Sequence, residues 1–311
     1  MILNKKFMIR IAKMAAPAVL LLQLVAFGCK KDSTHPREIV PKAELTQRIL
    51  DSTGLIANLF SDTSFVVVPG VEETDLHFQN EAGYSTHVYL LKVDLNHEGI
   101  RLQAGTPYGS KPFALQTVPV MAQYLDSAGN RVVAGLNADF FSTVGEPRGI
   151  AIKDGKILKT TWANARSASF VGVKDDGAVF IGNREDFDNM KDEFRDALGA
   201  GQILVWNNAV QVQTDVSIEP RTAVGINENG IMVFAVVDGR SFYYSNGISI
   251  TDLGILLKAC GSTTVVNLDG GGSSTFMIKH PLAPVWQVRN RPSDGNNRAV
   301  GNSWMIIADQ P

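Results

Sequence analysis

The sequence has few of the features that mark a redox, metal-binding or nucleotide-binding protein. Only two cysteines occur in 311 residues, Cys29 and Cys260, too few for a disulfide framework. The five histidines are scattered, and no spacing places two of them on one helix face as metal ligands. Neither a GxGxxG motif nor a Gly-Lys-Ser/Thr phosphate loop is present. We therefore expect no nucleotide cofactor and no zinc site.

The chain also lacks a large excess of either positive or negative charge. The 29 basic and 31 acidic residues give a formal net charge of −2 at pH 7. Nucleic-acid-binding domains carry an excess of clustered positive charge. The balance therefore predicts no nucleic-acid partner. The 45% hydrophobic and 19% charged content is that of an ordinary globular chain.

The apolar run near the N-terminus is too short for a comfortable membrane span. Four basic residues precede the stretch AAPAVLLLQLVAFG, which ends just before Cys29. This order is typical of an export signal. The tetrapeptide AFGC resembles a bacterial lipobox, so we expect lipid on Cys29 and an exported protein anchored to the cell envelope through that lipid only. A simple secretory signal cleaved nearby is the alternative.

The rest of the chain divides by composition. Residues 1–28 are the predicted lipoprotein signal peptide, and the charged, proline-containing residues 29–42 are a predicted tether. Residues 43–63 have a partly helical apolar stripe and predict a short docking helix. Residues 64–311 are expected to form one domain. Cys260 lies at the apolar end of a predicted helix, which favours a buried structural thiol over a nucleophile.

Strand-like segments separated by turn signals dominate the predicted domain. Hairpins are expected at 149–158, 168–182, 202–211 and 221–240. Helices are expected at 117–129, 185–201 and 250–261. Regular βαβ alternation is missing. The pattern predicts an α+β fold with a mixed, largely antiparallel sheet built from hairpins with flanking helices.

One loop combines an acid with residues that expose the backbone. In NLDGGGSST, Asp269 and three glycines follow the apolar pair Val265 and Val266, and two serines come next. Glycines allow positive φ and let a ligand reach successive N–H groups, which can form an anion-binding concavity. A flexible surface turn with no functional role is the alternative. The apolar residues on both sides of the loop favour a site.

Two arginines flank the hairpin predicted at 221–240. Arg221 begins it and Arg240 ends it, so both are expected at one edge of the sheet. A guanidinium group suits the paired oxygens of phosphate or carboxylate. Structural ion pairs, Glu219 with Arg221 or Asp238 with Arg240, are the competing interpretation.

Three acids, Asp139, Asp238 and Asp269, each follow an apolar stretch. Glycosidic bond cleavage commonly uses a pair of carboxyl groups, one of them with its pKa raised by burial or by a like charge. The sequence does not say which acid would donate the proton. For each one alone, a turn-forming role is the competing interpretation.

The motifs NADFF, RTAVGI, VVDGR and NLDGGGSST, in this order, resemble those of the phosphodiester glycosidase family. The similarity covers about residues 85–308, and NRAVGNSWMII is similar to the closing strand of the family. The resemblance implies hydrolysis of a sugar-1-phosphate diester at the anomeric carbon, in a bacterial envelope or a host glycan. It implies catalytic roles for Asp269, Asp139, Asp238, Arg221 and Arg240. It implies substrate binding by Asn137, Thr222, Asn267, Gly270, Gly271, Gly272, Ser273, Ser274 and Arg298.

One departure from the family pattern bears on this expectation. Many members have Gly-Gly where Ala138 and Asp139 stand here. The change adds a carboxyl group or alters which sugar fits. It leaves open a non-catalytic lipoprotein that binds a glycan or wall polymer. A metal-dependent phosphodiesterase is a third possibility, because three aspartates can hold a hard cation such as Ca²⁺, although their spacing is not that of a calcium loop.

Overall fold

The computed structural model describes residues 40–163, 167–280, 282–283 and 285–309. The predicted signal peptide, Cys29 and most of the predicted tether lie outside the described residues. The described residues from Pro41 onward belong to one compact unit, Pro41–Pro311. Within the described part of this unit, no helix is both long enough and apolar enough to cross a membrane.

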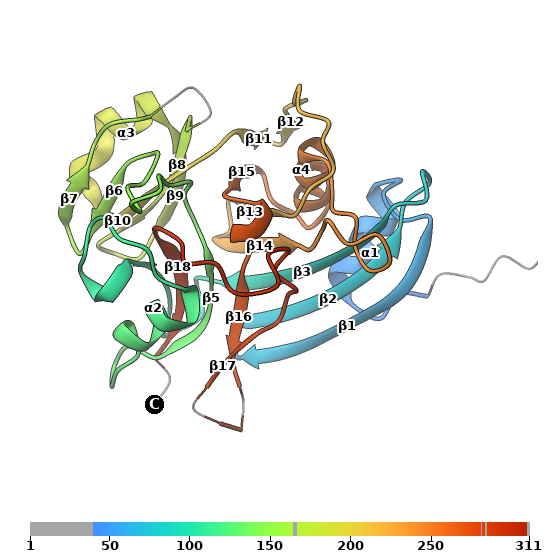
Figure 1. Ribbon diagram of the computed structural model, residues 1–311, viewed down its shortest axis with the longest axis horizontal. Helices are drawn as coiled ribbons and strands as arrows, with labels where there is room; N and C mark the ends of the chain where they lie inside the picture. Colours follow the sequence, from blue (N-terminus) through green and yellow to red (C-terminus); the bar gives the residue numbers. More distant parts are fainter. Residues whose placement is uncertain (1–39, 164–166, 281, 284, 310–311) are drawn as a thin grey trace, which may run out of the picture. The chain divides into compact units, whose positions relative to one another are not determined.

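The largest sheet has eight strands and runs across the unit in Figure 1. Its order is β1 (Asn58–Val68), β2 (Val71–Gln79), β3 (Ser85–Asp94), β14 (Ile231–Val237), β13 (Arg221–Ile226), β15 (Thr264–Leu268), β11 (Ile203–Trp206) and β12 (Ala209–Val210).

Two five-stranded sheets complete the β-structure. One has the order β7 (Lys156–Lys159), β6 (Ala151–Lys153), β10 (Phe194–Ala200), β8 (Ser169–Lys174) and β9 (Val179–Asn183). The other has the order β17 (Trp286–Val288), β16 (Phe276–Lys279), β5 (Val132–Asn137), β18 (Ser303–Ala308) and β4 (Ile100–Gly105). The named strand pairs in the described residues are all antiparallel. The α+β prediction is confirmed, with antiparallel sheets in place of a mixed one.

Helices are few and short in the described chain. The α-helices are α1 (Glu44–Ser52), α2 (Val118–Leu125), α3 (Arg184–Met190) and α4 (Ile250–Ala259), and the 3₁₀ turns are η1 (Pro107–Gly109), η2 (Lys191–Glu193) and η3 (Gly271–Ser273). Helix α4 begins after Ser249, whose hydroxyl accepts a hydrogen bond from the Asp252 N–H at 3.1 Å. The buried leucines of α4 pack on the outer face of the large sheet.

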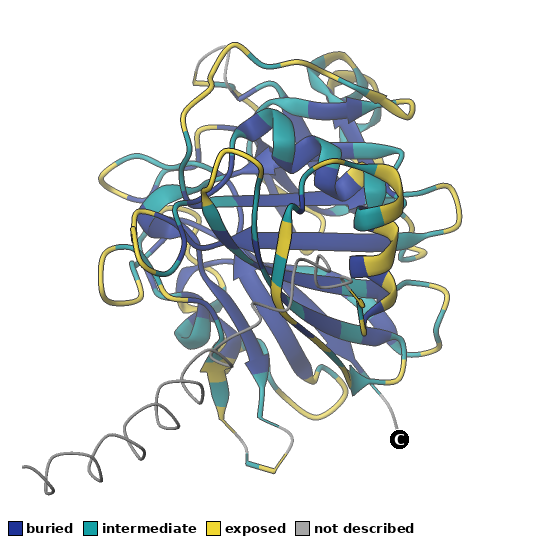
Figure 2. Cartoon of the chain, turned by 90° about the vertical axis from the view of Figure 1, so that its right-hand side faces the viewer, coloured by how far each residue is buried: buried dark blue, intermediate teal, exposed yellow. Residues whose placement is uncertain are grey.

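The main core lies between the inner faces of the three sheets. Large side chains such as Leu91, Phe234, Phe276 and Trp304 meet there. Figure 2 shows most strands buried, while exposed residues lie in the loops and along the outer faces of helices, and β1 is largely exposed. A second cluster fills the space between the large sheet, α1 and α4. Burying apolar side chains on both faces of the central strands fixes their register, since a one-residue slip would reverse every side chain.

One local prediction was wrong, and another gave a range that was too long. The helix expected at 185–201 ends at Met190, and β10 begins at Phe194. Strand β10 is central in its sheet, and the buried Asp196 carboxylate accepts backbone N–H groups of Ala104 and Asp154, so tertiary contacts override the helical pattern. The expected docking segment 43–63 is helical only in α1, and its last residues belong to β1.

Candidate active site

Ends of strands from the different sheets meet at one place. Ser303 of β18 pairs with Asn137 at the end of β5, and Thr222 of β13 pairs with Leu268 at the end of β15. Arg221 at the start of β13 pairs with Val237, the last residue of β14. Hydrogen bonds from Asn137 to Asp269 and Thr222 join these strand ends across the two sheets, so the loops that carry the predicted polar residues lie close together.

Asn137 joins two of these loops. Its side-chain N–H donates to the Asp269 carbonyl at 2.6 Å. Its side-chain oxygen accepts the Thr222 hydroxyl at 3.1 Å and the Thr275 N–H at 3.0 Å. Only 1% of Asn137 is exposed. The Asn137 side chain, which was expected to bind sugar, instead holds the glycine loop in place from its buried side.

Backbone conformation and close neighbours require glycine at positions 270–272. The Gly271 N–H donates to the Pro220 carbonyl at 2.8 Å, and Gly271 has φ +61°. A Cβ at Gly270 would lie 2.7 Å from the same carbonyl oxygen. A Cβ at Gly272 would overlap the Arg298 guanidinium. The loop is thus fixed against neighbouring backbone and is not a free surface turn.

Two guanidinium groups border this loop. A Cβ built on Gly271 would lie 3.3 Å from Nη2 of Arg240, and Arg298 donates to the Ser273 hydroxyl at 3.3 Å. The Arg240 backbone is in the left-handed region, with φ +60°. Both side chains remain about half exposed, at 49% and 41%. They can therefore meet an anion from solvent.

Each arginine is held by an acid. Arg240 donates to Glu219 at 2.6 Å, and Arg298 donates to Asp294 at 2.7 Å. Arg221 is paired with Asp215 at 3.4 Å. Ion pairing at Arg221 and Arg240 was one interpretation of the sequence, but the partners differ from those considered.

Arg221 lies deeper than the other two arginines. Its Nη2 donates to the Ser217 carbonyl at 2.9 Å, and its side chain is 12% exposed. Its Nε is buried and has no hydrogen-bond partner among the described residues. The Arg221 backbone packs against Gly270, where an added Cβ would lie 3.4 Å from the Arg221 Cα.

Asp269 is the acid that the site presents to solvent. It is partly buried, at the end of β15, and its N–H donates to the Ala138 carbonyl at 2.9 Å. Burial raises the pKa of its carboxyl group to about 6, although hydrogen bonds from Ser273 and Gly270 and the charge of Arg298 act in the opposite direction. Asp269 can therefore exchange a proton near neutral pH.

Asp139 lies behind it and is 1% exposed. Its Oδ2 accepts the Gly149 N–H at 2.7 Å, and a Cβ on Gly199 would lie 2.6 Å from that oxygen. Oδ1 is buried without a partner among the described residues. Burial raises the pKa to about 7, and the charge of Asp269 adds to the rise. Asp139 was expected to be catalytic; its burial allows action only through Asp269 or a proton path.

Asp238 is a structural anchor. Its carboxylate accepts the Arg291 N–H at 2.9 Å and the Asn290 side-chain amide at 3.1 Å. Burial raises its pKa, and these hydrogen bonds oppose the rise. At 2% exposure it holds the segment around Asn290 instead of meeting a substrate, as its predicted catalytic role would require.

The other predicted binding residues surround the same loop but are buried. The Thr222 hydroxyl, which donates to Asn137, also lies 3.3 Å from the Ser274 hydroxyl. The Asn267 side-chain amide donates to Gln202 at 3.3 Å, and its Oδ1 has no partner among the described residues. Ser273 is also buried and contacts Arg298.

Sequence reasoning missed several residues that position the acids. Asn302 accepts the Asp139 N–H at 2.8 Å, and Asn290 and Arg291 bind Asp238. Asn302 lies within the NRAVGNSWMII motif, so that motif carries a usable signal. Asn290 and Arg291 lie in a loop of mixed polarity, and no motif there indicates their role.

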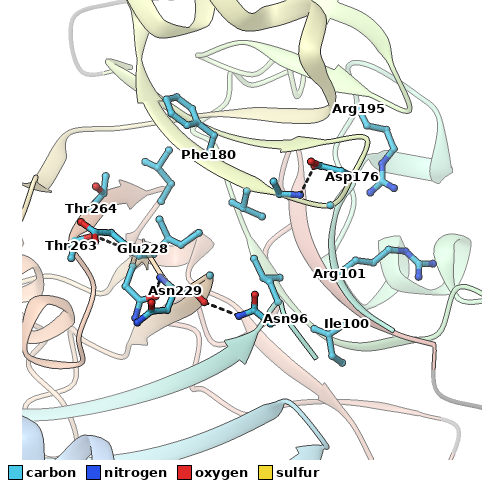
Figure 3. Close-up of a pocket in the computed structure, with 18 of the residues that line it drawn as sticks. Asn96, Ile100, Arg101, Asp176, Phe180, Arg195, Glu228, Asn229, Thr263 and Thr264 are labelled. Carbon is cyan, nitrogen blue, oxygen red and sulfur yellow. Dashed lines mark hydrogen bonds between the residues drawn. The ribbon is translucent and has the colours of Figure 1, made fainter. Parts of the chain in front are cut away.

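A cavity of about 1090 Å³ lies at the opposite ends of the strands. It is bordered by turns such as those around Asn96, Asp176 and Asn229, with Arg101 and Arg195 on one side (Figure 3). Ile226 and Thr264, at its rim, are the far ends of β13 and β15. Its size therefore does not identify the chemical site, which we place by the acids and arginines. Within the described residues, no three His, Cys, Asp or Glu side chains are grouped as a metal site.

Cys260 is a free, buried cysteine at the end of α4, as predicted. Burial raises the pKa of its thiol to about 12. A thiol with so high a pKa is a poor nucleophile at neutral pH.

Comparison with known proteins relates this arrangement to a family. A protein of Bacillus subtilis described as an SPbeta prophage-derived uncharacterized protein is 33% identical over 190 residues, covering 57% of this chain and 28% of that protein. Mouse N-acetylglucosamine-1-phosphodiester alpha-N-acetylglucosaminidase is 25% identical over 177 residues, covering 50% of this chain and 33% of the enzyme. The chain thus spans about a third of the length of these relatives.

A solved structure agrees in fold. The catalytic domain of the zebrafish N-acetylglucosamine-1-phosphodiester alpha-N-acetylglucosaminidase, auto-inhibited by its pro-peptide, has a TM-score of 0.60 at 20% identity. The match covers 80% of this chain and 89% of that one. A family model described as phosphodiester glycosidase matches residues 130–307, which contain every predicted catalytic and substrate-binding residue. The chain belongs to the phosphodiester glycosidase family.

Proposed function

We propose that this protein hydrolyses a sugar-1-phosphate diester at the glycosidic C–O bond. The observation that carries the proposal is the glycine loop with a guanidinium group on either side, Arg240 and Arg298, next to the ionisable Asp269. The two guanidinium groups offer positive charge to one anion. The N–H groups of Gly271, Ser273 and Ser274 are already bonded to backbone carbonyls, so they hold the shape of the loop. The adjacent acid then lies where the sugar attached to that anion would be.

The phosphate in this scheme is the leaving group. The anomeric C–O bond breaks and its electron pair departs with the phosphate monoester. The oxygen of a water molecule becomes the anomeric hydroxyl. Arg240 and Arg298 stabilise the charge that develops on the phosphate oxygens, so the leaving group needs less protonation than an alcohol would.

Asp269 takes the proton of the attacking water, or attacks the anomeric carbon itself. Either role requires the ionised carboxylate, which a pKa of about 6 provides at neutral pH. Asp139 is a positioning and electrostatic residue here, because its buried carboxyl group faces Gly149 and Gly199. A negative charge on either acid disfavours charge on the other.

The cellular location predicted from the sequence extends this proposal. The N-terminal sequence favours export and attachment to the cell envelope through lipid on Cys29. An envelope or host glycan with sugar-1-phosphate diester links is then the substrate class within reach. Processing at Cys29 is checked by mass spectrometry of the N-terminal peptide: an unmodified, cleaved N-terminus would assign a simple secretory signal.

The test is a panel of hexosyl-1-phosphate methyl diesters in both anomeric forms, with released reducing sugar as the readout. We expect turnover of at least one, and a loss of about a thousandfold in the Asp269→Asn variant. Asp51→Asn, an exposed acid of α1, is the matched control and should keep full activity. Saturable binding of the panel without any product would instead identify a non-catalytic glycan-binding protein.

A further inference from the structure

The cavity at the far ends of β13 and β15 takes no part in the proposed hydrolysis. Segments of all three sheets line it: the turn after β3, the start of β4, the β8–β9 hairpin and the turn between β13 and β14 (Figure 3). Ile100 and Ile181 belong to the main core, and Leu95, Val179 and Ile226 pack against it. The floor of the cavity is therefore apolar and held in place by the core.

One side of the cavity is the free edge of β9. This strand is the last of its sheet and pairs with β8 alone, without a register shift. At the hairpin end, the Lys174 N–H donates to the Ala178 carbonyl at 2.8 Å. Alternate residues of an antiparallel pair bond to the partner strand. Phe180 therefore directs its backbone N–H and C=O toward β8, whereas Val179 and Ile181 direct theirs away from it.

A second sheet edge beside the cavity, that of β4, differs from the edge of β9. Arg195 donates to the Leu102 carbonyl at 3.3 Å, and the Asp196 carboxylate accepts the Ala104 N–H at 3.3 Å. Side chains of β10 thus cap the edge of β4. The outward groups of β9 have no backbone partner elsewhere in the described chain, so this edge is able to pair with another strand.

The unpaired charges of the cavity are negative. Both of its arginines are paired with acids, Arg101 with Asp309 and Arg195 with Asp196 at 3.6 Å. Three exposed acids line the cavity without an ion pair in the described part of the chain: Asp175, Asp176 and Glu228. The cavity therefore favours a ligand with positive charge.

We propose that this cavity binds an extended, basic peptide segment of another protein, which adds to the free edge of β9 as a further strand. The N–H and C=O groups of Val179 and Ile181 bond to its backbone. Its alternate apolar side chains lie on the floor, and its lysine or arginine side chains meet the three acids. Strand addition of this kind is a recurring mode of peptide recognition. The proposal does not depend on the chemistry at Asp269.

The probe is the acetylated and amidated pentapeptide KVTVK, titrated into the full-length protein by calorimetry and by amide NMR. We expect a dissociation constant below about 1 mM. The largest amide signal changes should occur at Val179 and Ile181, with a smaller change at Phe180, whose N–H faces β8. N-methylation of both valines removes two backbone donors and keeps every charge, so it should weaken binding about tenfold. The acidic peptide EVTVE should bind more weakly still.

Two protein variants test the same site from the other side. Glu228→Lys replaces an attraction with a repulsion at an exposed turn and should weaken KVTVK binding about fivefold. Val179→Pro removes an outward N–H and leaves the bonds to β8, so it should also weaken binding. Glu81→Lys, an exposed acid in the turn at the other end of β3, is the matched charge control and should bind as the wild type does.

Three results would overturn the proposal. One is that KVTVK does not bind at millimolar concentration. Another is that the N-methylated or acidic peptide binds as well as KVTVK, or that Glu228→Lys behaves like Glu81→Lys. The third is a concentration-dependent dimer, formed without peptide and abolished by Val179→Pro, which would assign the edge of β9 to a second copy of this chain.

Discussion

The side-chain amide of Asn137 donates to the backbone carbonyl of Asp269 across 2.6 Å, joining the end of β5 to the loop after β15. These residues are 132 positions apart in the chain. The same side chain accepts from Thr222 and Thr275, so one buried amide fixes the position of the accessible acid relative to the strands around it.

The first prediction concerns this amide. Asn137→Asp leaves the volume but replaces the donor to Asp269 with an acceptor, and it buries an additional carboxylate. We expect kcat/KM for the methyl diester to fall by at least about a hundredfold, because Asp269 moves from its productive position. Asn229→Asp, an exposed amide in the turn between β13 and β14, is the control and should change nothing. Wild-type turnover in Asn137→Asp would remove the positioning role.

The second prediction concerns the anion clamp. Arg240→Ala and Arg298→Ala should each lower kcat/KM by about a hundredfold, roughly 3 kcal/mol of transition-state stabilisation. Arg131→Ala, an exposed arginine outside the site, is the matched charge control. If both site variants behave like Arg131→Ala, the phosphate does not bind between these two residues.

Gly272 gives a third test, because a side chain there would meet both the Arg298 guanidinium and the Asp294 carboxylate that holds it. Gly272→Ala should displace this flexible ion pair and lower kcat/KM as much as Arg298→Ala does, with little change in Tm. Combining both changes should add no further loss, since each removes the same interaction. Gly54→Ala has open space around it and serves as control. Additive losses in the double variant would mean that Gly272 acts through something other than Arg298.

The fourth prediction is a pH dependence of activity. Asp269 acts as a carboxylate with a pKa of about 6, so kcat/KM should fall below about pH 6 as the group is protonated. Free-enzyme titration of this kind is measured from kcat/KM between pH 4.5 and 8 with the methyl diester. A profile that is flat across that range would show that Asp269 is not the titrating catalytic group.

The fifth prediction is a pH dependence of stability. Burial holds the pKa of Asp139 at about 7, above its ordinary value of 3.8, so the folded state binds a proton that the unfolded chain has released. This stability is present below about pH 4 and is lost as pH rises toward 7, by an amount on the order of 4 kcal/mol.

Asp139→Asn mimics the protonated group and should remove this loss. In urea unfolding, the variant should match the wild type below about pH 4 and exceed it at pH 8. Equal pH dependence in the two proteins would show that Asp139 is not the source. Asp196→Asn, a second buried acid at 0% exposure, is the comparison that separates a specific effect from any buried carboxyl group.

The sequence predicted the gathering of loops better than the role of each side chain. The glycine loop, Arg240 and Asp269 could be placed together because apolar strands precede or follow them with turn signals between. The burial of Asp139 and Asp238 could not be predicted. The sequence pattern around an aspartate after a strand is the same whether its carboxyl group faces solvent or is buried, as that of Asp139 is between Gly149 and Gly199. Only the meeting of separate sheets decides that direction.

The helix expected at 185–201 shows the same limit in the fold. Its first part is helical, with a capping box in which Asn183 and Asp186 exchange hydrogen bonds. The second part has apolar residues whose spacing suits either the helical period or the alternation of a strand. Pairing of β10 with β6 and β8 on both sides selects the strand, and that information lies more than 40 residues away for β6.

The most direct test of the central claim is hydrolysis of a cleaved sugar-1-phosphate diester in ¹⁸O-labelled water, with both products analysed by mass spectrometry. Attack at the anomeric carbon beside Asp269 predicts one ¹⁸O atom in the released sugar and none in the phosphate monoester. Label in the phosphate monoester and none in the sugar would mean that the P–O bond is cut, and would contradict the account.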